Sequence, residues 1–144
     1  RPGTENVASI VGLGVASAIA SKTLEAEAKR VGLLRDRLFQ LLSDQIPGLG
    51  VNGSRAPRLP NTLSVRFPRV TGSALLAATP TIAASTGSAC HDGHETASAI
   101  ILAMGLPAAD VEGTVRLSLG RMTTEAQVVE AAAALVTAWK QLTR

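Results

Sequence analysis

The residues of this chain most able to do chemistry are a cysteine in a loop-like segment and an arginine in a strand-like one. Cys90, the only cysteine, follows the small and hydroxyl residues Ser-Thr-Gly-Ser-Ala at 85–89 and precedes His-Asp-Gly-His at 91–94. Cysteines kept for packing usually lie among apolar neighbours, so this setting favours a reactive thiol presented on a loop. Arg116 lies in Val-Arg-Leu-Ser-Leu at 115–119, and the planar donor fork of a guanidinium suits a substrate carboxylate. Cys90 and Arg116 are therefore a candidate catalytic pair.

A zinc site is the alternative interpretation of the same segment, because thiolate and imidazole are common zinc ligands. The candidate ligands would be Cys90, His91, Asp92, His94 and Glu95. Adjacent Cys and His side chains can seldom both reach one tetrahedral ion. We therefore expect no metal here, and we expect His91 and His94 to be loop residues.

Composition narrows the classes of function. The chain has 144 residues, 46% of them hydrophobic, which is enough for one domain with its own core. Its net charge of +3 comes from scattered arginines, and with two Phe, one Trp and no Tyr it lacks stacking aromatics, so nucleic acid is not indicated. A single cysteine excludes an intrachain disulfide and fits a reducing compartment, so we expect a cytoplasmic protein.

Neither apolar stretch of the sequence predicts a membrane span. The uncharged stretch 6–21 is shorter than the roughly 20 residues that a span requires, and Pro80 interrupts the stretch 70–89. We therefore expect no membrane partner and no signal peptide. Because the sequence starts at Arg1 without an initiator methionine, we expect a fragment of a longer polypeptide.

Hydrophobic spacing predicts an α/β fold. A small-residue helix capped by Thr4 should run to about residue 20, and an amphipathic helix should follow from Thr23 to about 41. The other expected elements are a short strand near 51–52, strands at 61–67, 81–84 and 114–119, helices at 73–78 and 96–104, and a last helix opened by 123–125 with the stripe Val128, Ala132, Leu135, Trp139 and Leu142. Alternation in the strand at 61–67 places Leu63, Val65 and Phe67 on one side. These elements predict a small, mostly antiparallel sheet that is covered by helices and preceded by a long helix.

Four segments, in this order along the chain, share the pattern of one family. They are Arg-Pro-Gly-Thr-Glu-Asn at 1–6, Leu-Pro-Asn-Thr at 59–62, Ser-Thr-Gly-Ser-Ala-Cys at 85–90, and Arg-Leu-Ser-Leu-Gly-Arg at 116–121 with Thr-Thr-Glu at 123–125. Together they resemble the C-terminal part of cysteine desulfurases, which belong to the class V aminotransferase group of pyridoxal-phosphate (PLP) enzymes. The resemblance covers nearly the whole chain and extends to selenocysteine lyases.

The resemblance implies roles for three residues. Cys90 matches the nucleophile that takes sulfur from L-cysteine as a persulfide and leaves alanine, and Arg116 matches the arginine that binds the substrate carboxylate. Thr4 matches the threonine that reaches the PLP phosphate of the neighbouring subunit in a homodimer. Arg1, Asn61 and Arg121 also fall in the family motifs, and we expect structural roles for them.

The chain departs from the family pattern at the cofactor lysine. That lysine lies beside a histidine in the family, whereas Lys22, Lys29 and Lys140 all fall in helix-like stretches without a neighbouring histidine. The resemblance therefore implies that residues 1–144 are the small C-terminal domain of a PLP fold-type I enzyme, with 1–20 packing toward a missing large cofactor domain. By itself the chain should not catalyse.

The sequence is compatible with three functions. The first is a PLP-dependent cysteine desulfurase that passes its persulfide sulfur to an acceptor such as an iron–sulfur scaffold protein. The second is a selenocysteine lyase, which would share the fold and the thiol. The third belongs to another class: a non-catalytic domain that serves only in dimer contact or acceptor docking.

Overall fold

The chain begins with one long helix, where the sequence predicted two. The computed structural model describes residues 3–54, 56–87 and 99–144, and its first element is α1 (Val7–Ser43). The predicted cap at Thr4 is wrong, because the Asn6 side chain caps the helix by accepting a hydrogen bond from the Ser9 N–H at 3.1 Å. The predicted break near residues 20–23 is also wrong, because that stretch holds no glycine or proline to end a helix.

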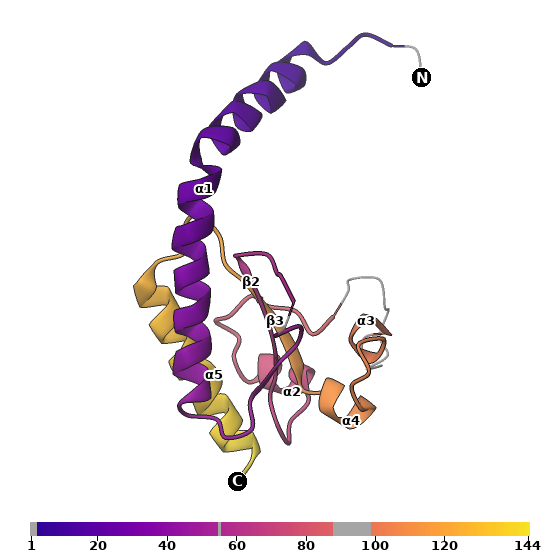
Figure 1. Cartoon of the computed structure of the whole chain (residues 1–144), viewed down its shortest axis with the longest axis vertical. Helices are drawn as coiled ribbons and strands as arrows, with labels where there is room; N and C mark the ends of the chain where they lie inside the picture. The colour runs from indigo at the N-terminus through magenta and orange to yellow at the C-terminus, as the bar shows by residue number, and fades with distance from the viewer. Residues whose placement is uncertain (1–2, 55, 88–98) are drawn as a thin grey trace.

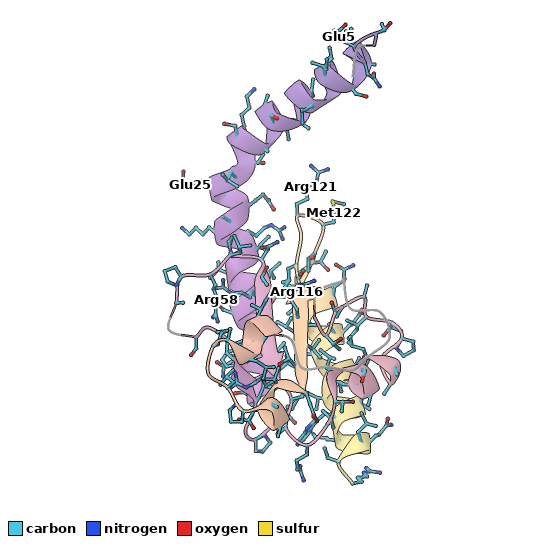
Figure 2. All side chains as sticks on the ribbon, turned by 90° about the vertical axis from the view of Figure 1, so that its right-hand side faces the viewer. Glu5, Glu25, Arg58, Arg116, Arg121 and Met122 are labelled. Atoms are coloured by element: carbon cyan, nitrogen blue, oxygen red, sulfur yellow. The ribbon has the colours of Figure 1, made fainter. Side chains whose placement is uncertain are left out.

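The two halves of α1 have different surroundings. Residues 7–26 are exposed, whereas Val31, Leu38 and Leu42 in the second half are buried. Figure 1 shows the first half standing clear of the other elements and bending away from the second half, and Glu25 lies near the bend in Figure 2. The Thr23 hydroxyl donates a hydrogen bond to the Ile19 carbonyl at 3.0 Å, a type of contact that bends helices.

The first half of α1 is also apolar enough to be compared with a membrane-spanning helix. By length and composition alone, α1 could cross a bilayer, and the apolar window that meets this test is not buried in the chain. The sequence-based expectation counted only residues 6–21. Because the helix continues to Ser43, length does not exclude a span, and the expectation of no membrane span stays a prediction.

The sheet is small and antiparallel, as predicted. It contains β1 (Gly50–Val51), β2 (Thr62–Arg66) and β3 (Thr114–Ser118) in the order β1-β2-β3. The strand predicted at 81–84 is absent, and the chain there makes only an isolated bridge between Ser85 and Arg116. A turn closed by Ile82 N–H and Thr79 carbonyl at 3.0 Å occupies the region instead, directly around Pro80.

Alternation along the strands separates an apolar face of the sheet from a polar one. Leu63, Val65 and Phe67, which were predicted to share one side of the strand, are at most 2% exposed. Together with Val115 and Leu117 of β3 they belong to the core that α1 and α5 (Glu125–Leu142) contribute to. Burying one such side chain stabilises the fold by about 1.5–3 kcal/mol, so this face holds the sheet against the two long helices.

Helix α5 starts and packs as predicted. Its cap is Thr124, whose hydroxyl accepts from Gln127 N–H while the Gln127 side chain accepts from Thr124 N–H, a complete capping box. The predicted stripe is buried except for Leu142, which is 43% exposed at the end of the helix. The indole of Trp139 donates a hydrogen bond to the Pro68 carbonyl at 2.9 Å, which ties α5 to the chain after β2.

Three short helices complete the described part of the chain. The predicted helix at 73–78 is α2 (Gly72–Ala77), which contacts α5. Of the helix predicted at 96–104, residues 96–98 lie outside the described residues and α3 covers Ala99–Leu102. The sequence analysis missed α4 (Ala108–Val111), which follows Pro107 at its N-cap. In Figure 1, α3 and α4 lie on the other side of the sheet from α1 and α5.

Candidate functional site

Arg116 is placed by the alternation of β3. Its neighbours Val115 and Leu117 are buried on the core face, so the guanidinium projects from the polar face, where the residue is exposed. Figure 2 shows Arg116 on the sheet, below the loop that carries Arg121 and Met122. Within the described residues, no hydrogen bond or ion pair engages its guanidinium. This donor fork is therefore available to an anion.

The segment that leads to the cysteine starts beside Arg116. Arg116 N–H donates to the Ser85 carbonyl at 2.7 Å, and Ser85 N–H donates to the Arg116 carbonyl at 3.3 Å. The Ser85 hydroxyl donates to the Gly87 carbonyl at 2.7 Å and accepts from Gly87 N–H at 3.3 Å, which fixes the turn at this point. Cys90, His91 and His94 lie outside the described residues, so their predicted roles stay predictions.

A row of polar residues crosses the sheet at the level of Arg116, and the sequence analysis missed it. The register pairs Ser64 of β2 with Arg116, and Asn52 N–H donates to the Ser64 carbonyl at 2.9 Å on the other side. The row therefore runs Asn52, Ser64, Arg116, Ser85. Alternation predicted the outward face of residues 61–67, but only the pairing of distant strands brings these polar side chains together.

Asn52 is the hydrogen-bond centre of this face. It is 7% exposed, and its side-chain amide nitrogen donates to the Ser64 hydroxyl at 2.9 Å and to the Thr114 hydroxyl at 3.5 Å. Its side-chain oxygen accepts a hydrogen bond from the Arg66 guanidinium. Buried polar groups are costly unless they are paired, so this network holds these four side chains in place on the face of the sheet that carries Arg116.

Thr4 lies far from Arg116 in the chain's own structure. It is exposed and precedes the Asn6 cap at the free end of α1. In Figure 2, its neighbour Glu5 lies at the opposite end of the molecule from the sheet that carries Arg116. One copy of the described chain thus does not bring Thr4 and Arg116 into a single site.

The loop after β3 is attached to α1 by one arginine. The Arg30 guanidinium donates to the carbonyl oxygens of Thr123 at 2.9 Å and Arg121 at 2.8 Å, with a longer bond of 3.4 Å to Gly120. Arg30 also forms an ion pair with Glu27 at 2.9 Å, and this hydrogen bond lowers the pKa of Glu27 from its ordinary value of 4.5. Arg121 therefore contributes its backbone to a structural contact, while its exposed side chain lies at the tip of the loop.

No cluster of metal-ligating side chains occurs in residues 3–54, 56–87 and 99–144. Both histidines and the cysteine fall outside those ranges. The expectation that this protein has no zinc site is therefore untested.

The sequence is similar to cysteine desulfurases over most of its length. It is 45% identical over 130 residues to the cysteine desulfurase of Nostoc sp., covering 89% of this chain and 32% of that protein. It is 43% identical over 130 residues to the cysteine desulfurase NifS of Azotobacter vinelandii, with the same coverage. The chain thus spans about a third of the length of these curated relatives.

The fold matches a solved structure of the same kind. A NifS-like protein superimposes with a TM-score of 0.77 at 32% identity, over 99% of this chain and 35% of that one. This match supports an α/β portion of a fold-type I enzyme. The family model of the class-V aminotransferases covers residues 1–130, and the chain therefore belongs to the class-V aminotransferase family, with cysteine desulfurases among its relatives.

Proposed function

We propose that this chain is the small C-terminal domain of a PLP-dependent cysteine desulfurase, in which Arg116 binds the substrate carboxylate and Cys90 accepts its sulfur. The observation that carries the proposal is the pair of backbone hydrogen bonds between Ser85 and Arg116. Cys90 follows Ser85 by five positions, so their Cα atoms can lie at most about 18 Å apart when the chain is fully extended. Covalent connectivity thus limits how far the thiol can lie from the guanidinium.

The described residues do not form a PLP site by themselves. Lys22 and Lys29 are exposed on α1, and Lys140 is exposed on α5, where it donates to the Gln45 side chain at 3.1 Å. The neighbours of Arg116 across the sheet are serines. We therefore assign the lysine that would bind PLP to the part of the polypeptide outside this chain, and the chain alone should be inactive.

The net reaction accounts for the sulfur atom and for the electron pair of the bond that breaks. The Cys90 sulfur would attack the sulfur of L-cysteine, an S–S bond would form and the C–S bond of the substrate would break. The electron pair of that bond passes to the carbon skeleton, which takes up a proton and leaves as L-alanine. L-cysteine and a thiol thus give L-alanine and a persulfide, without any external oxidant or reductant.

The proposed function also implies a packing partner for the exposed half of α1. Its apolar side chains include Val11, Leu13 and Ile19, which are 59%, 70% and 48% exposed in this chain. We propose that the large cofactor domain of the same polypeptide packs against residues 7–26. A homodimer would then bring Thr4 to the PLP phosphate of the second subunit, and the persulfide would pass to an acceptor such as an iron–sulfur scaffold protein in the cytoplasm.

The test uses the complete polypeptide loaded with PLP, as wild type and as Cys90→Ser. With L-cysteine, the wild type should release alanine and carry a persulfide on the Cys90 peptide, both measurable by mass spectrometry. Cys90→Ser should keep the cofactor absorbance and release alanine only at the background rate. Undiminished alanine release by Cys90→Ser would refute the role of the thiol.

The alternatives differ in the outcome of this experiment. A wild type that releases alanine from selenocysteine but not from cysteine would be a selenocysteine lyase. A wild type that is inactive on both amino acids would favour the non-catalytic docking domain.

A further inference from the structure

The polar row beside Arg116 contains a hydroxyl that accepts one hydrogen bond and whose proton is available. A serine hydroxyl offers one donor and two acceptor lone pairs. The Ser64 oxygen accepts from the Asn52 amide at 2.9 Å. No hydrogen bond from the Ser64 hydroxyl to another residue is present in the described part of the chain. Its O–H can therefore donate to a ligand.

The direction of this hydroxyl is determined by a rigid neighbour. Asn52 is buried, and it is held at its oxygen by Arg66 and at its nitrogen by Thr114 as well as Ser64. An amide that is fixed at both ends cannot follow the hydroxyl if it rotates. The Ser64 oxygen is thus kept in place, with its proton directed away from Asn52.

Arg116 is the cross-strand neighbour of Ser64. Their Cα atoms are paired in the β2–β3 register, and directly opposed residues on one face of an antiparallel pair have Cβ atoms about 4.5–5.5 Å apart. A carboxylate that takes the guanidinium fork with both oxygens still has lone pairs left for a further donor. An anion bound by Arg116 on this face therefore comes within reach of Ser64.

The other two serines near Arg116 fit this role less well. The Ser85 hydroxyl already donates to the Gly87 carbonyl at 2.7 Å, so its proton is engaged. Ser118 is paired with Thr62 and not with Arg116, although it lies on the same face of β3. Of the three, Ser64 combines direct opposition to Arg116 with an available proton.

We propose that Ser64 is a second substrate-binding residue, which donates a hydrogen bond to the same carboxylate that Arg116 binds. This inference rests on the proposed function, because it takes the substrate to be an α-amino acid. Arg116 supplies the charge and Ser64 supplies a donor from the neighbouring strand. Two donors of the guanidinium fork and the Ser64 hydroxyl then orient the carboxylate together.

The test compares Ser64→Thr with Ser64→Val in the complete, PLP-loaded polypeptide. Threonine and valine have nearly the same shape and both suit a strand, so the pair differs mainly in the hydroxyl. Ser64→Ala is measured alongside, and Ser118→Ala serves as a control on the same face. The readouts are KM and kcat for alanine release from L-cysteine, and the Kd for L-alanine by isothermal titration.

Removing a hydrogen bond to a charged group should weaken binding by roughly tenfold or more. We therefore expect Ser64→Val and Ser64→Ala to raise both KM and the Kd for L-alanine about tenfold, with kcat nearly unchanged. Ser64→Thr and Ser118→Ala should behave like the wild type. In an Arg116→Gln background the effect of Ser64→Val should shrink, because the two donors share one ligand.

Equal Kd values for Ser64→Thr and Ser64→Val would overturn the inference, as would an equal loss in Ser118→Ala. If Ser64 served only to pair Asn52, the variants would change the midpoint of unfolding and leave KM and Kd unchanged, which would also overturn it. A wild type that releases no alanine from L-cysteine would refute the proposed function instead. The titration with L-alanine would then still decide whether Ser64 contributes to carboxylate binding.

Discussion

Replacing Gly72 by alanine should destabilise the chain, because the backbones of α2 and β3 lie too close together at Gly72 to leave room for a Cβ atom. Gly72 is the first residue of α2 and is buried against β3 and the start of the segment that leads to Cys90. A Cβ atom at this position would lie 2.9 Å from the Thr86 methyl carbon and 3.3 Å from the Thr114 carbonyl carbon, with the Thr114 carbonyl oxygen closer still. Carbon atoms pack best at about 3.5–4.0 Å, so α2 would have to move by about 0.6 Å or more.

The expected loss follows from two opposing effects. Overpacking of a well-packed site costs about 1–3 kcal/mol, and the hydrogen bond from Gly72 N–H to the Glu112 carbonyl, now 2.8 Å, would weaken at a cost of about 1 kcal/mol. Alanine recovers up to about 1 kcal/mol over glycine in a helix. The clash outweighs the helix propensity, and the net free energy of unfolding should fall by about 1–3 kcal/mol.

The matched control is Gly14→Ala in the exposed half of α1. A Cβ there would meet nothing within 4 Å in this chain, so only the propensity gain applies, about 0.5–1 kcal/mol of stabilisation. Urea titration followed by the fluorescence of Trp139, the single tryptophan, measures both variants, since Trp139 is buried and contacts the Pro68 carbonyl. If Gly72→Ala proved as stable as Gly14→Ala, the close approach described here would be refuted.

Three further predictions concern the contacts of α1. Val11→Asp should leave the unfolding midpoint of this chain nearly unchanged, because Val11 is 59% exposed, but should lower the melting temperature of the complete polypeptide; equal effects in the two would contradict a covered helix face. Arg30→Gln should release the loop at 120–123, seen as faster amide hydrogen exchange there, and unchanged exchange would contradict the role of Arg30. In the wild type, the lowered pKa of Glu27 means that the ion pair contributes above pH 4.5 and is lost as the pH falls through the folded-state pKa.

Sequence patterns predicted those helices and strands whose ends and buried faces depend on residues close together in the chain. The alternation at Leu63, Val65 and Phe67 identified β2 and the residues that share one of its faces, and Thr-Thr-Glu at 123–125 marked the start of α5. The errors have equally local causes. The small residues of the first helix were separated from the amphipathic stretch after Thr23, although no residue between them breaks a helix.

The candidate site was predictable only in part, because its geometry depends on pairing between distant strands. The type and exposure of Arg116 could be predicted from β3 alone. Its neighbours Ser64 and Ser85 could not, because a shift of one residue in register would place different side chains beside it. Asn52, directly after the two-residue strand β1, gave no periodic signal in the sequence.

The free half of α1 acts as a lever arm. About 20 residues of helix at 1.5 Å per residue span about 30 Å, so a rotation of about 5° at the packed half displaces the tip by about 2.6 Å. A shift of that size is enough to break a hydrogen bond made by Thr4. The packing of α1 on α5 therefore cannot by itself position Thr4, and the accuracy of any contact that Thr4 makes must come from the surface that supports residues 7–26.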